Sequence, residues 1–258
     1  MKKNLIYGIV CQKMHINKIY SPNFSYNLKK TRKIMFVIIH YTGMQSTRES
    51  LKRLKNYKSK VSCHYLIDRE GKIISMVKDR DIAWHAGKSR WMKFKNLNPY
   101  SIGIELQNKG HKLKYENYTN EQINSLIKIC KILKKKYKLK KSSFLGHSDI
   151  APNRKVDPGE KFPWNKLSKK GLGICIPKKI SLKKLKLLSS KQTNRLFLKN
   201  LKKIGYRYLS SSLDKKSEKN TKVIKAFQMR FYNKNIDGKI NRKMLEISEF
   251  IAKNKDFP

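Results

Sequence analysis

The apolar run at residues 34–39, Ile-Met-Phe-Val-Ile-Ile, restricts the fold of this chain most. A continuous apolar run rich in β-branched residues is typical of a strand buried on both faces. His40 follows directly at its carboxyl end. In open α/β sheets ligands bind at that end of the strands, so His40 is well placed to serve a site. We therefore expect this strand to lie inside a sheet, with a site at its carboxyl end.

Further patterns predict the rest of this sheet and its helices. Residues 119–137 have the clearest helical spacing, with Thr119 and Gln122 as a predicted capping box. Thr47 is expected to cap an earlier helix. The remaining strands are expected at residues 62–68 and 73–77, which form a hairpin around a glycine turn, and at 101–108 and 143–145.

Residues 146–159 place a histidine, a lysine and a carboxylate in one loop, Gly-His-Ser-Asp-Ile-Ala-Pro-Asn-Arg-Lys-Val-Asp-Pro-Gly. Its prolines rule out a continuous helix, so His147 and Asp157 meet only if the loop folds back on itself. Such a pair supplies two of the three protein ligands of a catalytic zinc site. His40 is the expected third ligand. Taken alone, a hydrogen-bonded histidine at a strand end is the more common interpretation.

Glu105 is a carboxylate inside a predicted strand and points to the opposite face from Ile104 and Leu106. A buried charge without a partner is costly. A metal-bound water beside Glu105 would compensate this cost. A carboxylate in that position can act as a general base. Nearby, the loop at residues 82–87 carries Trp84 and His85, and the aromatic face is suited to cover a sugar or a peptide.

The chain has a formal net charge of +45, from 62 lysines and arginines against 17 acidic residues. Such a field attracts polyanions, including anionic surfaces of a cell envelope. The lysines are spread over every segment, however, so we expect no specific nucleic-acid partner. The four cysteines contain no C-x-x-C pair and therefore predict neither a disulfide scaffold nor a cysteine zinc site.

Residues 1–19 form an N-terminal lead with a basic start and an apolar stretch at 5–11. That stretch is at or below the lower end of the roughly 7 to 15 residues of a signal core, so export is left open. Lipid modification at Cys11 is also open, although Val10 stands where a small residue should precede it. We expect the periplasm or cell envelope as the location, with the cytoplasm as the alternative.

Five blocks occur in the order typical of one enzyme family: residues 37–42, 61–67, 83–87, 101–105 and 146–159. Together they resemble the zinc-dependent N-acetylmuramoyl-L-alanine amidases, the family related to phage lysozyme-type amidases and peptidoglycan recognition proteins. The resemblance covers about residues 20–175 and implies an α/β (α+β) fold with a central mixed β-sheet flanked by helices. It implies one Zn²⁺ held by His40, His147 and Asp157, with Glu105 as general base and Lys155 stabilising the oxyanion.

The implied reaction is hydrolysis of the amide bond between the lactyl group of N-acetylmuramic acid and L-alanine, in peptidoglycan or in released muropeptides. Amide hydrolysis needs an activated water and a cation near the carbonyl oxygen, which distinguishes Lys155 from other surface lysines. Trp84, His85, Asn98 and Arg154 are the expected substrate contacts. The alternative is a peptidoglycan-recognition protein of the same fold that does not cut its ligand.

The C-terminal part predicts a small three-helix domain. Gly205-Tyr206, Phe227-Gln228 and Asp237-Gly238 resemble a peptidoglycan-binding domain, whereas amphipathic spacing alone would also fit a generic helical appendage. The predicted boundaries are 1–19 for the lead, 20–176 for the catalytic domain, 177–190 for a basic linker and 191–258 for the peptidoglycan-binding-like domain.

Overall fold

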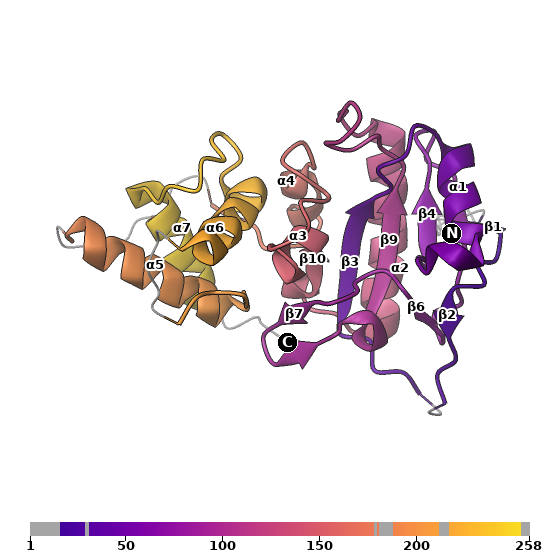
Figure 1. Cartoon of the computed structure of the whole chain (residues 1–258), viewed down its shortest axis with the longest axis horizontal. Coiled ribbons are helices and arrows are strands. Elements are labelled where there is room, and N and C mark those ends of the chain that lie inside the picture. The colour runs from indigo at the N-terminus through magenta and orange to yellow at the C-terminus, as the bar shows by residue number, and fades with distance from the viewer. Residues whose placement is uncertain (1–15, 29–30, 178–179, 181–187, 212–216, 254–258) are drawn as a thin grey trace, which may run out of the picture.

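The computed structural model describes residues 16–28, 31–177, 180, 188–211 and 217–253. They form a mixed α/β unit and a group of three C-terminal helices (Figure 1). The strands are β1 (Ile16–Lys18), β2 (Phe24–Ser25), β3 (Phe36–Tyr41), β4 (Tyr65–Ile67), β5 (Ile73–Ser75), β6 (Ile82–Ala83), β7 (Arg90–Trp91), β8 (Phe94–Lys95), β9 (Ser101–Leu106) and β10 (Phe144–Gly146). The α-helices are α1 (Thr47–Lys55), α2 (Asn120–Tyr137), α3 (His147–Ile150), α4 (Trp164–Ser168), α5 (Ser190–Ile204), α6 (Glu218–Phe231) and α7 (Arg242–Lys253).

Six strands form the central sheet in the order β1-β5-β4-β9-β3-β10. The β4–β5 hairpin is antiparallel and the other pairs are parallel, which confirms the predicted mixed sheet flanked by helices. The apolar run therefore lies inside the sheet, with β9 and β10 as its neighbours. Strand β3 pairs with β9 so that His40 is the register partner of Glu105.

Alternation along the strands divides the apolar side chains between the two faces of the sheet. Val37 and Ile39 pack with Ile104 under α2, whose buried side chains cover that face. Leu66 belongs to a second cluster beneath α1 on the opposite face. His40 and Glu105 alternate with the residues under α2 and so point away from that helix.

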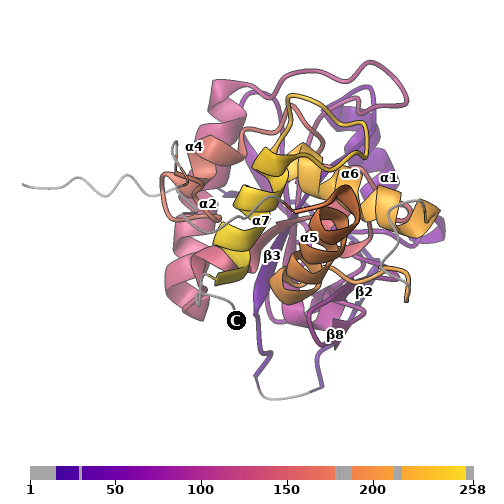
Figure 2. The ribbon, with the colours of Figure 1, turned by 90° about the vertical axis from the view of Figure 1, so that its left-hand side faces the viewer.

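Helices α5, α6 and α7 gather beside the β10 end of the sheet, and Figure 2 views the molecule from that side. Their apolar side chains share one buried cluster with Phe36, Ile38 and Leu145 from the sheet. Phe197 and Phe227 lie in this cluster with their ring centroids 5.1 Å apart. The helical group is thus packed against the catalytic fold by a common core.

Several details differ from the sequence-based expectations. Helix α1 is capped by Ser46, one residue before the expected Thr47. Thr119 caps α2, but the Gln122 side chain does not complete the capping box, because its amide donates to the carbonyl oxygens of Ile67 and Gln107. Residues 16–18 of the predicted lead form strand β1.

Other expectations fall outside the described residues. These include the apolar stretch at residues 5–11, Cys11, and residues 178–179 and 181–187 of the predicted linker. Across the part of the chain that the structure describes, no helix is long and apolar enough to cross a membrane.

Candidate active site

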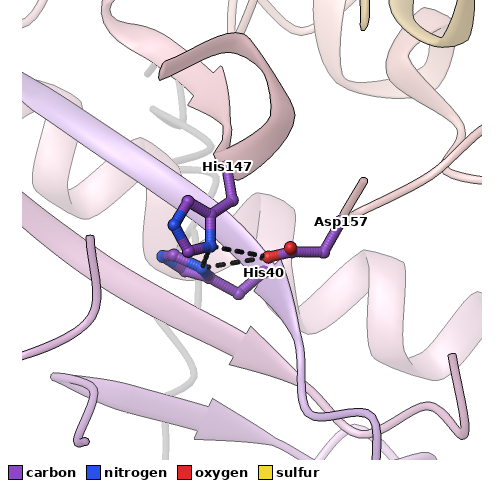
Figure 3. A group of neighbouring side chains, drawn as sticks. All are labelled: His40, His147 and Asp157. Carbon is purple, nitrogen blue, oxygen red and sulfur yellow. Dashed lines mark hydrogen bonds and ion pairs between the residues drawn. The ribbon is translucent and has the colours of Figure 1, made fainter. Parts of the chain in front are cut away.

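Three side chains from separate elements converge at the carboxyl ends of β3 and β10 (Figure 3). His40 lies on β3, His147 begins α3 directly after β10, and Asp157 lies in the loop that follows α3. Oδ2 of Asp157 is 3.2 Å from Nδ1 of His40 and 3.0 Å from Nδ1 of His147, and the two Nδ1 atoms are 2.9 Å apart. All three residues are buried.

The loop does not continue as a helix but folds back on itself. A backbone hydrogen bond holds its two ends together. The backbone N–H of Ser148 donates to the carbonyl oxygen of Asp157 at 2.8 Å. A Cβ atom at Gly146 would overlap Pro158, so glycine permits the close approach of the two ends of the loop. The fold of this loop therefore brings Asp157 to His147.

A hydrogen-bond chain determines which ring nitrogen of His40 faces the cluster. The Ser101 hydroxyl donates to the carbonyl oxygen of Leu97 at 2.7 Å, so its oxygen accepts from Nε2 of His85 at 3.2 Å. Nδ1 of His85 then accepts from Nε2 of His40 at 3.0 Å. This leaves Nδ1 of His40 with a lone pair directed at Asp157 and His147.

His147 has the same arrangement by a different route. Its Nε2 lies 3.3 Å from the carbonyl oxygen of Ala86 and 3.5 Å from Nη2 of Arg154. A neutral ring that donates from Nε2 to the carbonyl oxygen presents the lone pair of Nδ1 to the cluster. Hydrogen bonds from the far ring nitrogen are the usual way in which proteins orient histidine ligands of metals.

The donor set fits a metal cation. Burial and the repulsion of His147 lower the pKa of His40 to about 4, so its imidazole is neutral near pH 7. Burial alone would raise the pKa of Asp157, but His147 and His40 hold it well below its ordinary value. The three donor atoms lie close enough together to share one cation. Two imidazoles and one carboxylate are a donor set used by zinc.

Glu105 lies beside this cluster as the register partner of His40. Burial is the main cause that raises the pKa of Glu105 to about 8, and the charge of Asp157 adds to it. Lys155 acts in the opposite direction and lowers the pKa of Glu105. Among the described residues, none makes a hydrogen bond with the buried Oε2 of Glu105, which leaves this atom free for water or substrate.

A cavity of about 330 Å³ opens over these residues. Lys155 and Trp84 line it together with Glu105 and the three residues of the cluster. The indole N–H of Trp84 donates to the hydroxyl of Ser25 at 2.9 Å, which fixes the ring at the wall of the cavity. The cavity therefore combines a carboxylate, an ammonium group, an aromatic wall and the three clustered donors.

The structure shows contacts within the chain for three other expected substrate contacts, of which His85 also lines the cavity. His85 is buried and both of its ring nitrogens are engaged, by His40 and by Ser101. The side-chain oxygen of Asn98 accepts from the backbone N–H groups of His85 and Ala86. Arg154 donates to the carbonyl oxygens of Ala86 and Lys88. All three therefore hold the loop around Ala86, and their contact with substrate stays a prediction.

Sequence reasoning missed Ser101 and Gly103, which share the face of β9 with Glu105. A Cβ atom at Gly103 would overlap the ring of His85, so only glycine admits this histidine under the site. The alternation Ser101, Gly103, Glu105 is visible in the sequence and was the available signal. A serine and a glycine in a strand do not indicate a site unless their contacts with His85 are known.

The donor set and the neighbouring carboxylate are of the kind used by metal-dependent hydrolases. The model of the N-acetylmuramoyl-L-alanine amidase family (Amidase_2) matches residues 30–160, about half of the chain. The chain belongs to this family.

Individual relatives agree with this assignment. The chain is 37% identical over 153 residues to the N-acetylmuramoyl-L-alanine amidase AmiD of Escherichia coli, covering 55% of this chain and 54% of AmiD. It is 39% identical over 111 residues to the 1,6-anhydro-N-acetylmuramyl-L-alanine amidase AmpD of Haemophilus influenzae, covering 43% and 58%. The chain thus spans little more than half the length of these two relatives.

A solved structure extends the likeness to the C-terminal helices. AmiD from E. coli, in complex with the substrate anhydro-N-acetylmuramic acid-L-Ala-D-gamma-Glu-L-Lys, superimposes with a TM-score of 0.78 at 30% identity. The match covers 90% of this chain and 93% of that one. The packing of a helical group against an amidase fold is therefore shared with this neighbour.

Proposed function

We propose that this chain is a zinc-dependent N-acetylmuramoyl-L-alanine amidase. It would hydrolyse the amide bond between the lactyl group of N-acetylmuramic acid and L-alanine in peptidoglycan or muropeptides. The observation that carries the proposal is the convergence of Nδ1 of His40, Nδ1 of His147 and Oδ2 of Asp157 beside Glu105, in a chain of the amidase family.

His40, His147 and Asp157 would hold one zinc ion. When bound, zinc makes water a stronger nucleophile near neutral pH and polarises a carbonyl group. Glu105, ionised once a cation is bound beside it, would take a proton from the attacking water and deliver it to the nitrogen of L-alanine as the C–N bond breaks. Lys155, on the wall of the same cavity, would stabilise the negative charge on the carbonyl oxygen in the transition state.

The proposed partner is peptidoglycan or its fragments. Relatives named for anhydro-muropeptide cleavage and the substrate bound to AmiD support this class of ligand. The division into a catalytic part (20–176) and a wall-binding helical part (191–258) belongs to the same proposal, as does a location in the periplasm or cell envelope. The charge of +45 supports association with an anionic envelope.

Release of free stem peptide from purified muropeptides tests the proposal. We expect mass spectrometry to detect a peptide beginning with L-alanine, together with the complementary muramic acid product. Treatment with a chelator should abolish release and added zinc should restore it. Glu105→Gln should abolish release while leaving zinc bound. Release that continues in the presence of the chelator would contradict the zinc mechanism, and binding of muropeptides without release would favour the non-catalytic recognition protein.

A further inference from the structure

A buried polar network joins the C-terminal helices to the turn that carries His147. Asp149 lies on α3, two residues after His147. Tyr206, which follows α5, donates its hydroxyl to Oδ1 of Asp149 at 2.6 Å. Arg230 on α6 donates to Oδ2 of Asp149 and, at 2.7 Å, to the carbonyl oxygen of Phe144. The side chains of Asp149, Tyr206 and Arg230 are all buried.

This network does more than close the interface. The shared apolar cluster already packs the helices against the sheet through large side chains such as Phe197 and Phe227. A buried ion pair adds little stability compared with apolar packing, because both charges lose their hydration. Its fixed geometry instead constrains the orientation of the segment that Arg230 contacts. Arg230 donates to both ends of this short segment, the carbonyl oxygen of Phe144 at the start of β10 and the carboxylate of Asp149 on α3.

The constraint reaches two of the three clustered donors. The Asp149 carboxylate also accepts from the backbone N–H of Gly146 at 2.8 Å, which fixes the turn directly before His147. The backbone N–H of Ser148, on the same turn, holds the carbonyl oxygen of Asp157 at 2.8 Å. A displacement of α3 would therefore move His147 and Asp157 away from His40, which lies on a different strand.

Arg230 is also placed against the chain that follows Asp157. Its guanidinium lies over the ring of Trp164 on α4, 4.2 Å from the ring centroid. Burial and the neighbouring Asp149 raise the pKa of Tyr206 well above its ordinary value, so its hydroxyl remains a donor. The Tyr206 hydroxyl therefore keeps the proton that it donates to Asp149.

We propose that Tyr206 and Arg230 are positioning residues for the metal centre, and that the helical part of residues 190–253 helps to form that centre in addition to any wall binding. They act through Asp149, which holds the turn bearing His147 in place relative to His40. This inference rests on the proposed function of the cluster as a zinc site.

The test uses the full chain with Tyr206→Phe, which removes one hydrogen bond to Asp149 and keeps the ring. Arg230→Lys is the second variant, because lysine keeps the charge but lacks the planar fork that reaches both acceptors. Ser248→Ala is the matched control: it removes a buried hydrogen bond from Asn200 within the helical part, away from α3. Zinc affinity is measured by competition with a chromophoric chelator, and the site geometry by the visible absorption of the cobalt(II)-substituted protein.

We expect Tyr206→Phe to weaken zinc binding about 10-fold, at the lower end of the effect of residues that orient metal ligands. Arg230→Lys should weaken it at least as much. Both should change the cobalt(II) spectrum and lower kcat more than they raise KM. Ser248→Ala should lower the melting temperature of the metal-free protein but keep the zinc affinity and the spectrum of the unmodified chain.

The proposal is overturned if Tyr206→Phe melts at a lower temperature yet binds zinc with unchanged affinity and gives an unchanged cobalt(II) spectrum. If Arg230→Lys does not fold, Tyr206→Phe alone decides. Failure of the unmodified chain to bind zinc would overturn the proposed function itself, and the inference with it. Normal zinc binding and peptide release by both variants would overturn the inference alone.

Discussion

Replacing Glu105 by glutamine should stabilise the metal-free protein in alkaline solution while removing its activity. The carboxyl of Glu105 has its pKa raised from the ordinary 4.5 to about 8, mainly by burial. Between these two values the unfolded chain has lost this proton and the folded chain retains it. Unfolding then releases a proton, so the stability of the native protein falls as the pH rises from 4.5 to 8. Glutamine carries no proton to lose and avoids this decrease.

The size of the effect follows from the same two values. At about 1.4 kcal/mol per pH unit, the interval corresponds to an upper value of about 5 kcal/mol above pH 8. At pH 4.5 both proteins carry a neutral side chain in the folded state, so their free energies of unfolding should be nearly equal. An energy of this size is a large part of the free energy of unfolding of a typical domain.

Urea unfolding followed by circular dichroism, at several pH values from 4.5 to 9 with a chelator present, measures this difference. Glu70→Gln is the control, because Glu70 is exposed on the turn between β4 and β5. The control should not reproduce the gain in stability between pH 4.5 and 8 that is expected for Glu105→Gln. A difference for Glu105→Gln that is the same at pH 5 and pH 9 would refute the claim that Glu105 holds its proton in the folded state.

Three further results are expected. Lys155→Ala should lower kcat about 10²- to 10³-fold with unchanged zinc content, because a group that stabilises the oxyanion is lost, and equal turnover would exclude Lys155 from that role. His85→Ala should weaken zinc binding about 10- to 100-fold by releasing His40, with a smaller effect for Ser101→Ala; equal affinity in a chelator competition would contradict the hydrogen-bond chain. Trp84→Ala should raise KM for muropeptides more than it lowers kcat, and a fall in kcat alone would exclude the indole as a binding surface.

Much of the fold could be predicted because the strands are short and strongly apolar. The run at residues 34–39 identified the central strand, and its carboxyl end identified the edge at which donors meet. The position of His147 beside His40 then follows from the parallel pairing of β10 with β3. Asp157 can approach His147 because the loop between them does not continue as a helix and folds back on itself.

The roles of His85, Asn98 and Arg154 could not be predicted in the same way. Their sequence neighbourhood shows that the loop matters, but a side chain that binds substrate and one that holds a backbone carbonyl have the same residue types. The choice depends on distant partners: Asn98 accepts from residues 85 and 86, and Arg154 reaches back 68 positions to Ala86. Only the folded chain shows these contacts.

The sequence by itself predicted the buried central strand, the helix at 119–137 and the candidate donors, because periodicity and turn residues act locally, and the resemblance of its ordered blocks to the amidases supplied the mixed sheet and the full donor set. Tertiary structure decided how the donors are held. The ring orientation of His40 depends on Ser101 through His85, and the turn of His147 depends on Arg230, which lies 81 positions from Asp149. Such contacts leave no local pattern, since they arise only when packing buries the polar atoms and forces them to find partners.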